Sequence, residues 1–153
     1  MRVGPPPHVN LELEINVQNA VRNLIRQGLI KGAHDCSEGG VAVALAECCF
    51  NPEKLLGADI DLKAGDTPAT TVLFNESQSR IVISVDSKDA QKTTAILQQS
   101  GIPFQRLGQV EGNELRIRVN EKTFRWPIAD LYDGWFNAIR RAVEDETERI
   151  PSL

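Results

Sequence analysis

The chain has 153 residues, of which 41% are hydrophobic and 25% are charged, a composition typical of one soluble globular domain. Its 17 basic and 21 acidic residues give a net charge of −4 without a basic run, which excludes non-specific nucleic-acid binding. No apolar run approaches the length of a membrane span and no signal segment is recognisable, so we expect a cytoplasmic protein that binds no membrane.

Cysteine usage fits a reducing compartment. Cys36, Cys48 and Cys49 form no C-x-x-C pair, which argues against a disulfide framework or a zinc site. Cys36 lies beside a polar turn, but the sequence assigns no base to it. We therefore interpret it as a small packing residue rather than a nucleophile.

The N-terminal segment is predicted to be a linker. Pro5, Pro6 and Pro7 favour an extended polyproline conformation, which is typical of an inter-domain segment of a larger protein. We therefore predict a linker over residues 1–9, one domain over residues 10–145 and a charged tail over residues 146–153.

The first half of the chain is predicted to alternate helices and strands. Asn10 is a suitable N-cap for a helix over residues 11–27 that Gly28 ends, and this helix is expected to lay one face on a sheet. The apolar, small-residue helix over 41–50 is expected to be buried between layers. The other expected elements are a strand over 29–34, a strand over 57–62, a short helix over 70–75 and a central strand over 80–85.

The second half is predicted to contain a crossover helix over 87–100, strands over 104–110 and 114–119, and a last helix over 128–144. The turn Glu111-Gly112-Asn113 is expected to join the two strands as a hairpin, and residues 123–126 to add a short extended piece. The charged stretch 144–149 is expected to fray. Without a regular βα rhythm, these elements predict an α/β fold, a mixed β-sheet with packed helices.

A polar turn with two glycines leads directly into the apolar helix: residues 33–47 read AHDCSEGGVAVALAE. Asp35 or Ser37 is expected to cap the first free N–H groups, and Gly39 and Gly40 permit backbone angles that side chains forbid. A helix N-terminus of this kind can hold a phosphate or a carboxylate. The alternative is a capped strand-to-helix junction that binds nothing.

A second polar corner precedes the strand over 80–85, where residues 73–82 read LFNESQSRIV. Arg80 could grip a phosphate, Ser77 could donate to one, and Gln78 could bind an amide or a hydroxyl. The alternative is that Glu76 and Arg80 pair and only fix the turn.

Other candidates have weaker support. His34 could act as an acid or base, although a lone histidine at a strand end is more often hydrogen-bonded structure. Asp59 and Asp61 share a strand face and could ligate Mg²⁺, but nothing nearby in the sequence completes a coordination sphere. Trp126 and Trp135 are interpreted as core or interface anchors.

The two polar runs resemble the HDxSxGGxAxALAE and LFxESxxR signatures of the last domain of phosphoribosylformylglycinamidine synthases. This family belongs to the ATP-dependent superfamily that also contains aminoimidazole ribonucleotide synthetase. The motifs occur in the family's order, and the resemblance covers nearly the whole chain. It implies the superfamily's C-terminal domain fold, and the turn together with the run from Leu131 to Trp135 resembles the domain of the enzyme's second half.

The resemblance implies part of an enzyme that converts formylglycinamide ribonucleotide to formylglycinamidine ribonucleotide with ATP, Mg²⁺ and glutamine-derived ammonia. Most ATP and metal ligands of the family belong to N-terminal domains that this chain lacks. We therefore expect no catalytic residue, no metal site and no cofactor bound by this chain alone, and an inactive isolated chain. The implied partners are other domains of the synthase, a glutaminase and small accessory subunits, and a homodimer of this chain stays open.

The role of the second corner stays open within this resemblance. In the family, the substrate-contacting Glu-Ser-Gln motif belongs to the first half's C-terminal domain, so Glu76, Ser77 and Gln78 could contact substrate, an auxiliary nucleotide or only structure. The substrate and phosphate-binding candidates are Asp35, Ser37, Gly39, Gly40, Glu76, Ser77, Gln78 and Arg80. A different interpretation is a non-catalytic assembly module, and selenophosphate synthetase or thiamine-phosphate kinase relatives fit less well.

Overall fold

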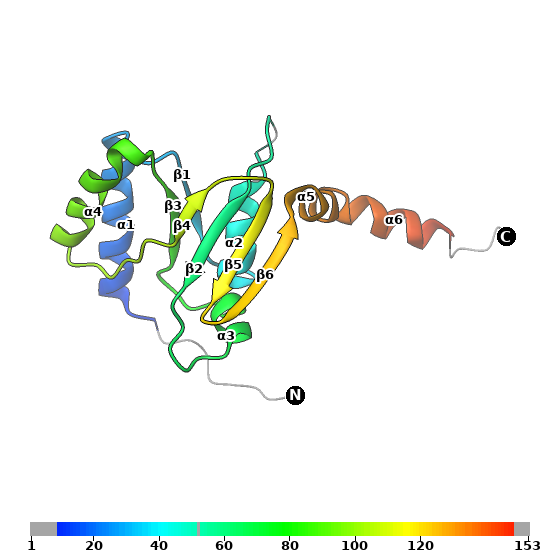
Figure 1. Ribbon diagram of the computed structural model, residues 1–153, viewed down its shortest axis with the longest axis horizontal. Helices are drawn as coiled ribbons and strands as arrows, with labels where there is room; N and C mark the ends of the chain where they lie inside the picture. Colours follow the sequence, from blue (N-terminus) through cyan, green and yellow to red (C-terminus); the bar gives the residue numbers. More distant parts are fainter. Residues whose placement is uncertain (1–8, 52, 149–153) are drawn as a thin grey trace.

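The computed structural model describes residues 9–51 and 53–148 (Figure 1). The predicted linker over 1–9 lies outside the described residues except for Val9, and so does the end of the predicted tail, residues 149–153. The helices are α1 (Leu11–Arg26), α2 (Gly40–Cys49), α3 (Ala69–Phe74), the 3-10 turn η1 (Ser87–Asp89), α4 (Ala90–Gln99), α5 (Ile128–Phe136) and α6 (Ala138–Glu148). The strands are β1 (Gly32–Asp35), β2 (Ala58–Leu62), β3 (Ile81–Ser84), β4 (Gly108–Val110), β5 (Glu114–Val119) and β6 (Lys122–Pro127).

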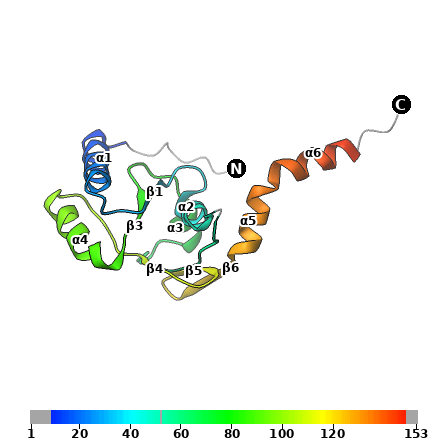
Figure 2. The same ribbon diagram turned by 90° about the horizontal axis from the view of Figure 1, so that it is seen from above.

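A small two-stranded sheet forms one layer. Strands β1 and β3 pair antiparallel, with Asp35 opposite Ile81 and Gly32 opposite Ser84. Helices α1 and α4 lie side by side next to this sheet (Figures 1 and 2). Their buried residues form one hydrophobic cluster, against which Ile81 and Ile83 of β3 also pack. The expectation that the first helix packs on a sheet is therefore confirmed for this sheet.

The larger sheet has the order β4-β2-β5-β6. Strand β2 runs parallel to β5 and antiparallel to β4, while β5 and β6 are antiparallel. Helix α2 lies between this sheet and the β1–β3 pair (Figure 2). Its apolar residues share a core with Leu73 of α3 and with the inward side chains of β2 and β5, namely Ala58, Ile60, Leu62, Leu115, Ile117 and Val119. The mixed α/β fold and the buried position of this helix are confirmed.

Local sequence signals located several element ends correctly. The Asn10 side chain accepts a hydrogen bond of 3.0 Å from the Leu13 amide, as expected of an N-cap. Gly28 follows α1 with a φ of +66°, the left-handed conformation that glycine adopts most easily at a helix end. The alternating strand over 57–62 matches β2, because Ala58, Ile60 and Leu62 are buried.

The predicted hairpin between β4 and β5 is wrong. Strand β4 pairs with β2, and the turn around Gly112 runs past the start of β2, where the Gly57 amide donates to the Gly112 carbonyl oxygen at 3.0 Å. At Gly108, an added Cβ would lie 1.8 Å from the carbonyl oxygen of Asp59, so only glycine permits this strand approach. The hairpin in the structure joins β5 to β6 through Asn120, whose φ is +53°.

Two further expectations are corrected. Strand β3 is not central, because it pairs with β1 in the two-stranded sheet. The single last helix is divided at Asn137 into α5 and α6, and α6 continues to Glu148 where fraying was expected. Figures 1 and 2 show this pair extending away from the rest of the molecule.

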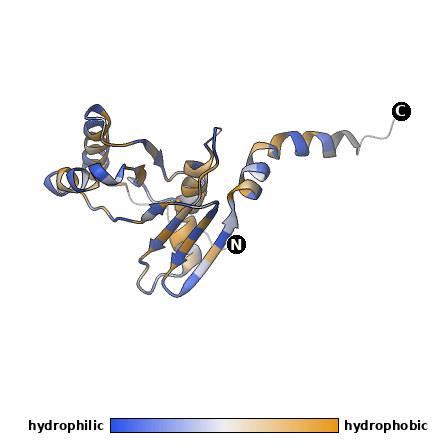
Figure 3. Ribbon diagram, turned by 45° about the horizontal axis from the view of Figure 1, so that its top comes forward, coloured by the Kyte–Doolittle hydropathy of each residue, from blue (hydrophilic) through white to orange (hydrophobic). Residues whose placement is uncertain are grey.

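The surface of the α5–α6 pair carries large apolar side chains. Leu131 packs on the main core. Further along, Trp135, Phe136, Ile139 and Val143 are 53%, 64%, 81% and 59% exposed. Figure 3 shows hydrophobic and hydrophilic residues interspersed along the pair. The predicted apolar face is therefore present, and its residues Trp135 and Ile139 stay more than half exposed in the structure. No helix within the described residues is long and apolar enough to cross a bilayer.

Candidate functional site

The junction between β1 and α2 depends on two consecutive glycines in the left-handed region. Gly39 has a φ of +77° and Gly40 a φ of +66°. A Cβ at Gly40 would lie 2.7 Å from the Asn75 carbonyl oxygen and 2.8 Å from that of Leu73, both at the end of α3. The start of α2 is therefore pressed against the segment that leads into the second polar corner, a contact that only glycine permits.

The cap of α2 comes from a distant residue. The Gly39 amide donates to the Glu76 carboxylate at 3.0 Å, and the Gly40 amide donates to the Ser37 carbonyl oxygen at 3.2 Å. The expected cap from the Asp35 or Ser37 side chain is wrong, because α2 has no side-chain cap from its preceding residue and the Ser37 hydroxyl donates to the Asp35 carboxylate. That hydroxyl lowers the pKa of Asp35 below its ordinary value.

The structure brings the two polar corners side by side. The Glu76 contact joins them through side chain and backbone, and the Cys36 amide donates to the Arg80 carbonyl oxygen at 2.9 Å. The strand pairing of Asp35 with Ile81 continues this contact. Residues 37 positions apart along the chain therefore meet beside the N-terminus of α2.

Internal hydrogen bonds hold the second corner. The Arg80 guanidinium donates to the Asn75 side-chain oxygen at 2.7 Å and to the Asn75 carbonyl oxygen at 3.1 Å. The Ser77 hydroxyl donates to the same Asn75 side chain at 2.8 Å. Among the described residues, no ion pair joins Glu76 to Arg80, so the alternative that these two side chains pair with each other to fix the turn is wrong. Glu76 instead accepts from the Gly39 amide of the other corner, and Arg80 donates to Asn75 within its own corner.

Ser79 connects this corner to α1. Its φ of +64° is left-handed, which costs a non-glycine residue about 1–2 kcal/mol. Its hydroxyl donates to the Glu14 carboxylate at 2.6 Å, and this bond is the main reason that the pKa of Glu14 is lowered. Gln78, the remaining candidate of this corner, is exposed.

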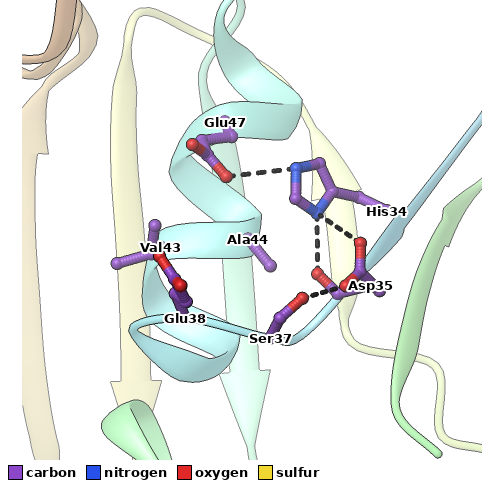
Figure 4. Close-up of a pocket in the computed structure, with 7 residues that line it drawn as sticks. All are labelled: His34, Asp35, Ser37, Glu38, Val43, Ala44 and Glu47. Carbon is purple, nitrogen blue, oxygen red and sulfur yellow. Dashed lines mark hydrogen bonds and ion pairs between the residues drawn. The ribbon is translucent and has the colours of Figure 1, made fainter. Parts of the chain in front are cut away.

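An open pocket of about 350 Å³ lies beside the first corner. Figure 4 shows its lining, which comes from the end of β1, the β1–α2 junction and one side of α2: His34, Asp35, Ser37, Glu38, Val43, Ala44 and Glu47. Three of these residues are acidic, and none is a lysine or arginine. The residues of the second corner do not line it, and neither does Gly39, whose amide Glu76 contacts.

His34 and Glu47 face each other across this pocket (Figure 4). The Nε2 atom of His34 lies 3.1 Å from one Glu47 oxygen, and Nδ1 lies 2.7 Å from the Asp35 carbonyl oxygen. The other Glu47 oxygen accepts a bond of 3.1 Å from the Trp135 indole. Glu47 and Trp135 were not predicted as site residues, because helical spacing places Glu47 in the pocket only once the strand carrying His34 has packed on α2.

The remaining candidates have structural partners. The Arg116 guanidinium pairs with Asp59, and Arg118 lies 3.8 Å from Asp61, so both carboxylates that were considered as weak Mg²⁺ candidates face arginines. Among the described residues, no cluster of three metal-ligating side chains is present. Cys36 and Cys49 are buried, and burial raises the pKa of Cys49 to about 11, as expected of packing thiols.

Comparison with known families decides the relationship. Residues 4–120 match the model of the AIR synthase related protein, C-terminal domain. The chain belongs to this family. Membership in the AIR synthase related C-terminal domain family confirms the resemblance drawn from the two motifs, and the mixed α/β architecture agrees with it.

The relatives are much longer than this chain. It is 39% identical over 143 residues to phosphoribosylformylglycinamidine synthase subunit PurL of Anaeromyxobacter sp. (strain Fw109-5), covering 89% of this chain and 18% of the relative. Identity reaches 49% over 111 residues with the PurL subunit of Synechococcus sp. (strain JA-3-3Ab), covering 71% and 14%. The chain thus spans less than a fifth of the length of these relatives.

A solved structure shares the fold of this AIR synthase related domain. T. maritima PurL complexed with FGAR superimposes with a TM-score of 0.68 at 23% identity, covering 78% of this chain and 21% of that one. At this identity, the likeness establishes the fold alone.

Proposed function

We propose that this chain is the C-terminal domain part of a phosphoribosylformylglycinamidine synthase, with its folded domain over residues 10–145. The whole enzyme is an ATP-dependent ligase of purine biosynthesis that converts formylglycinamide ribonucleotide to formylglycinamidine ribonucleotide with glutamine-derived ammonia. Family membership and the PurL relatives support this proposal. A cytoplasmic location follows from the same proposal.

The two joined corners are the proposed ligand-contacting surface. The observation that carries this assignment is the 3.0 Å bond between the Gly39 amide and Glu76, which unites the motifs at one helix N-terminus. A ligand anion that takes the Gly39 amide must displace the Glu76 carboxylate. The proposed contacts are Asp35, Ser37, Gly39, Gly40, Glu76, Ser77, Gln78 and Arg80.

The pocket itself does not fit a nucleotide triphosphate. Asp35, Glu38 and Glu47 line it without a lysine or arginine among its lining residues, and like charges repel phosphate. We therefore assign ATP and Mg²⁺ to the whole synthase, with their ligands mainly on its other domains. It follows that the isolated chain lacks synthase activity.

The test compares this chain with the whole synthase that contains it. Both proteins receive formylglycinamide ribonucleotide, ATP, Mg²⁺ and ammonium, and amidine formation and ADP release are measured. We expect turnover only from the whole synthase. Amidine formation by the 153-residue chain alone would contradict the proposal.

A second function, assembly, is supported by the exposed apolar residues of α5 and α6. Phe136 is 64% and Ile139 81% exposed, and side chains of this kind mark contact surfaces when they cluster. Because the relatives are more than five times as long as the matched segment, we propose that another domain of the same synthase covers this face. A glutaminase and small accessory subunits are the further partners proposed for the assembled enzyme.

The assembly proposal is tested with the remaining domains of the synthase produced as a separate chain. Ile139→Glu is expected to weaken their binding to this chain at least tenfold in an affinity measurement. Ile25→Glu is the matched control, since Ile25 is a 54% exposed isoleucine on α1. Figure 1 shows α1 and α6 at opposite ends of the molecule. Equal binding of both variants would contradict this assignment, and self-association by light scattering would indicate a homodimer instead.

A further inference from the structure

Glu47 of α2 uses both of its carboxylate oxygens in contacts with other elements. One oxygen lies 3.1 Å from His34 Nε2 of β1, and the other accepts from the Trp135 indole of α5 at 3.1 Å. Glu47 itself is only partly exposed and lines the pocket. Glu47 therefore connects His34 of β1 to Trp135 of α5.

The geometry around His34 determines where its ring protons lie. A carbonyl oxygen only accepts, so the 2.7 Å contact with Asp35 requires a proton on Nδ1. The contact between Nε2 and the Glu47 carboxylate is favourable only if Nε2 also carries a proton. When both contacts are made, His34 presents donors at both nitrogens and has no free lone pair to act as a base.

Trp135 holds Glu47 from the other side. Its ring centroid lies 5.3 Å from that of Phe50 and 6.1 Å from that of Tyr132, so the indole packs against two aromatic neighbours although the residue is 53% exposed. A fixed indole N–H leaves the carboxylate few alternative rotamers. The orientation of His34 in the pocket thus depends on the packing of α5.

We propose that Glu47 is a positioning residue that fixes the His34 imidazole at the pocket wall with one oxygen and fastens α5 to α2 with the other. Both ring nitrogens of His34 are then engaged, Nδ1 with the Asp35 carbonyl oxygen and Nε2 with Glu47, so neither is left to act as the base considered from the sequence. Contact between this imidazole and a ligand rests on the proposed function, whereas the arrangement of the three side chains does not. The test therefore uses no ligand and no activity.

The experiment is nuclear magnetic resonance of the 153-residue chain labelled with ¹⁵N in histidine and tryptophan. Glu47→Ala is expected to abolish the protected His34 Nε2–H signal and to move the Trp135 indole N–H upfield. Glu47→Gln keeps an oxygen for the indole, while its amide donates to an unprotonated Nε2. That variant should therefore lose the Nε2–H signal but keep the indole shift.

Two controls separate positioning from general destabilisation. Glu38→Ala removes another acidic residue of the same pocket and should leave both signals in place. The indole N–H signal of Trp126 should stay unchanged in every variant. If Glu47→Ala does not fold, Trp135→Phe keeps the aromatic packing and should make the His34 Nε2–H exchange faster. Unchanged signals in Glu47→Ala, unchanged exchange in Trp135→Phe, or equal changes in Glu38→Ala would each overturn the proposal.

Discussion

Alanine at Gly40 tests whether the two polar corners are packed against each other as described. Gly40 and Gly28 share a φ of +66°, so both substitutions place an alanine in the left-handed region. Around Gly28, an added Cβ meets nothing within 4 Å, whereas at Gly40 it meets backbone atoms of Asn75, Leu73 and Phe74 at 2.7–2.9 Å. The pair of variants therefore separates backbone strain from packing.

The magnitudes follow from these two terms. Left-handed alanine costs about 1–2 kcal/mol, which is the whole loss expected for Gly28→Ala. Overpacking adds about 1–3 kcal/mol at Gly40, and the upper part of that range applies because backbone carbonyl groups cannot rotate away as a side chain does. We expect Gly40→Ala to lose about 3–5 kcal/mol of unfolding free energy, out of roughly 5–15 kcal/mol for a typical domain.

The assay is equilibrium unfolding in urea, followed by circular dichroism and compared at equal m-values. Gly101→Ala is a second control, since Gly101 also has a φ of +66° and open space around it. Thermal unfolding should agree, at about 2–4 °C for each kcal/mol in a chain of this size. Equal losses for the Gly40, Gly28 and Gly101 variants would refute the close contact between the start of α2 and the end of α3.

Three further predictions concern the corners and the thiols. Glu76→Ala should cost about 1 kcal/mol by removing the cap of α2, and Glu76→Gln less; hydrogen exchange at the capped amide checks this, and equal exchange contradicts it. The Ser79 bond lowers the pKa of Glu14 below its ordinary value, so the stability that this bond contributes is complete above that ordinary pKa and is lost as the pH falls through the lowered one. The difference in unfolding free energy between the unchanged protein and Ser79→Ala should therefore narrow in acid, and a constant difference argues against the bond. A thiol reagent should label exposed Cys48 before Cys49, whose pKa is raised to about 11, and equal rates would show that α2 opens readily.

The candidate site was recognisable from sequence because its parts are local. The glycine pair and the two polar runs are visible as short motifs, and they meet near the start of α2 in the structure. The partners of these residues were not recognisable. The Glu76 carboxylate and the Gly39 amide are 37 positions apart in the sequence, and Trp135 and Glu47 are 88 positions apart. Helix and strand periodicity relates only residues a few positions apart, so it could not predict either contact.

The sequence by itself determined the elements whose signals lie within a few residues. Asn10 and Gly28 bound α1, and the alternation of Ala58, Ile60 and Leu62 placed one face of β2 in the core. Only the tertiary structure decided that β4 pairs with β2, that Trp135, Phe136 and Ile139 of α5 and α6 stay exposed, and that the two motifs meet. The physical reason is that helix caps and strand alternation depend on neighbours along the chain, whereas strand pairing and side-chain contacts between elements depend on how the whole core packs.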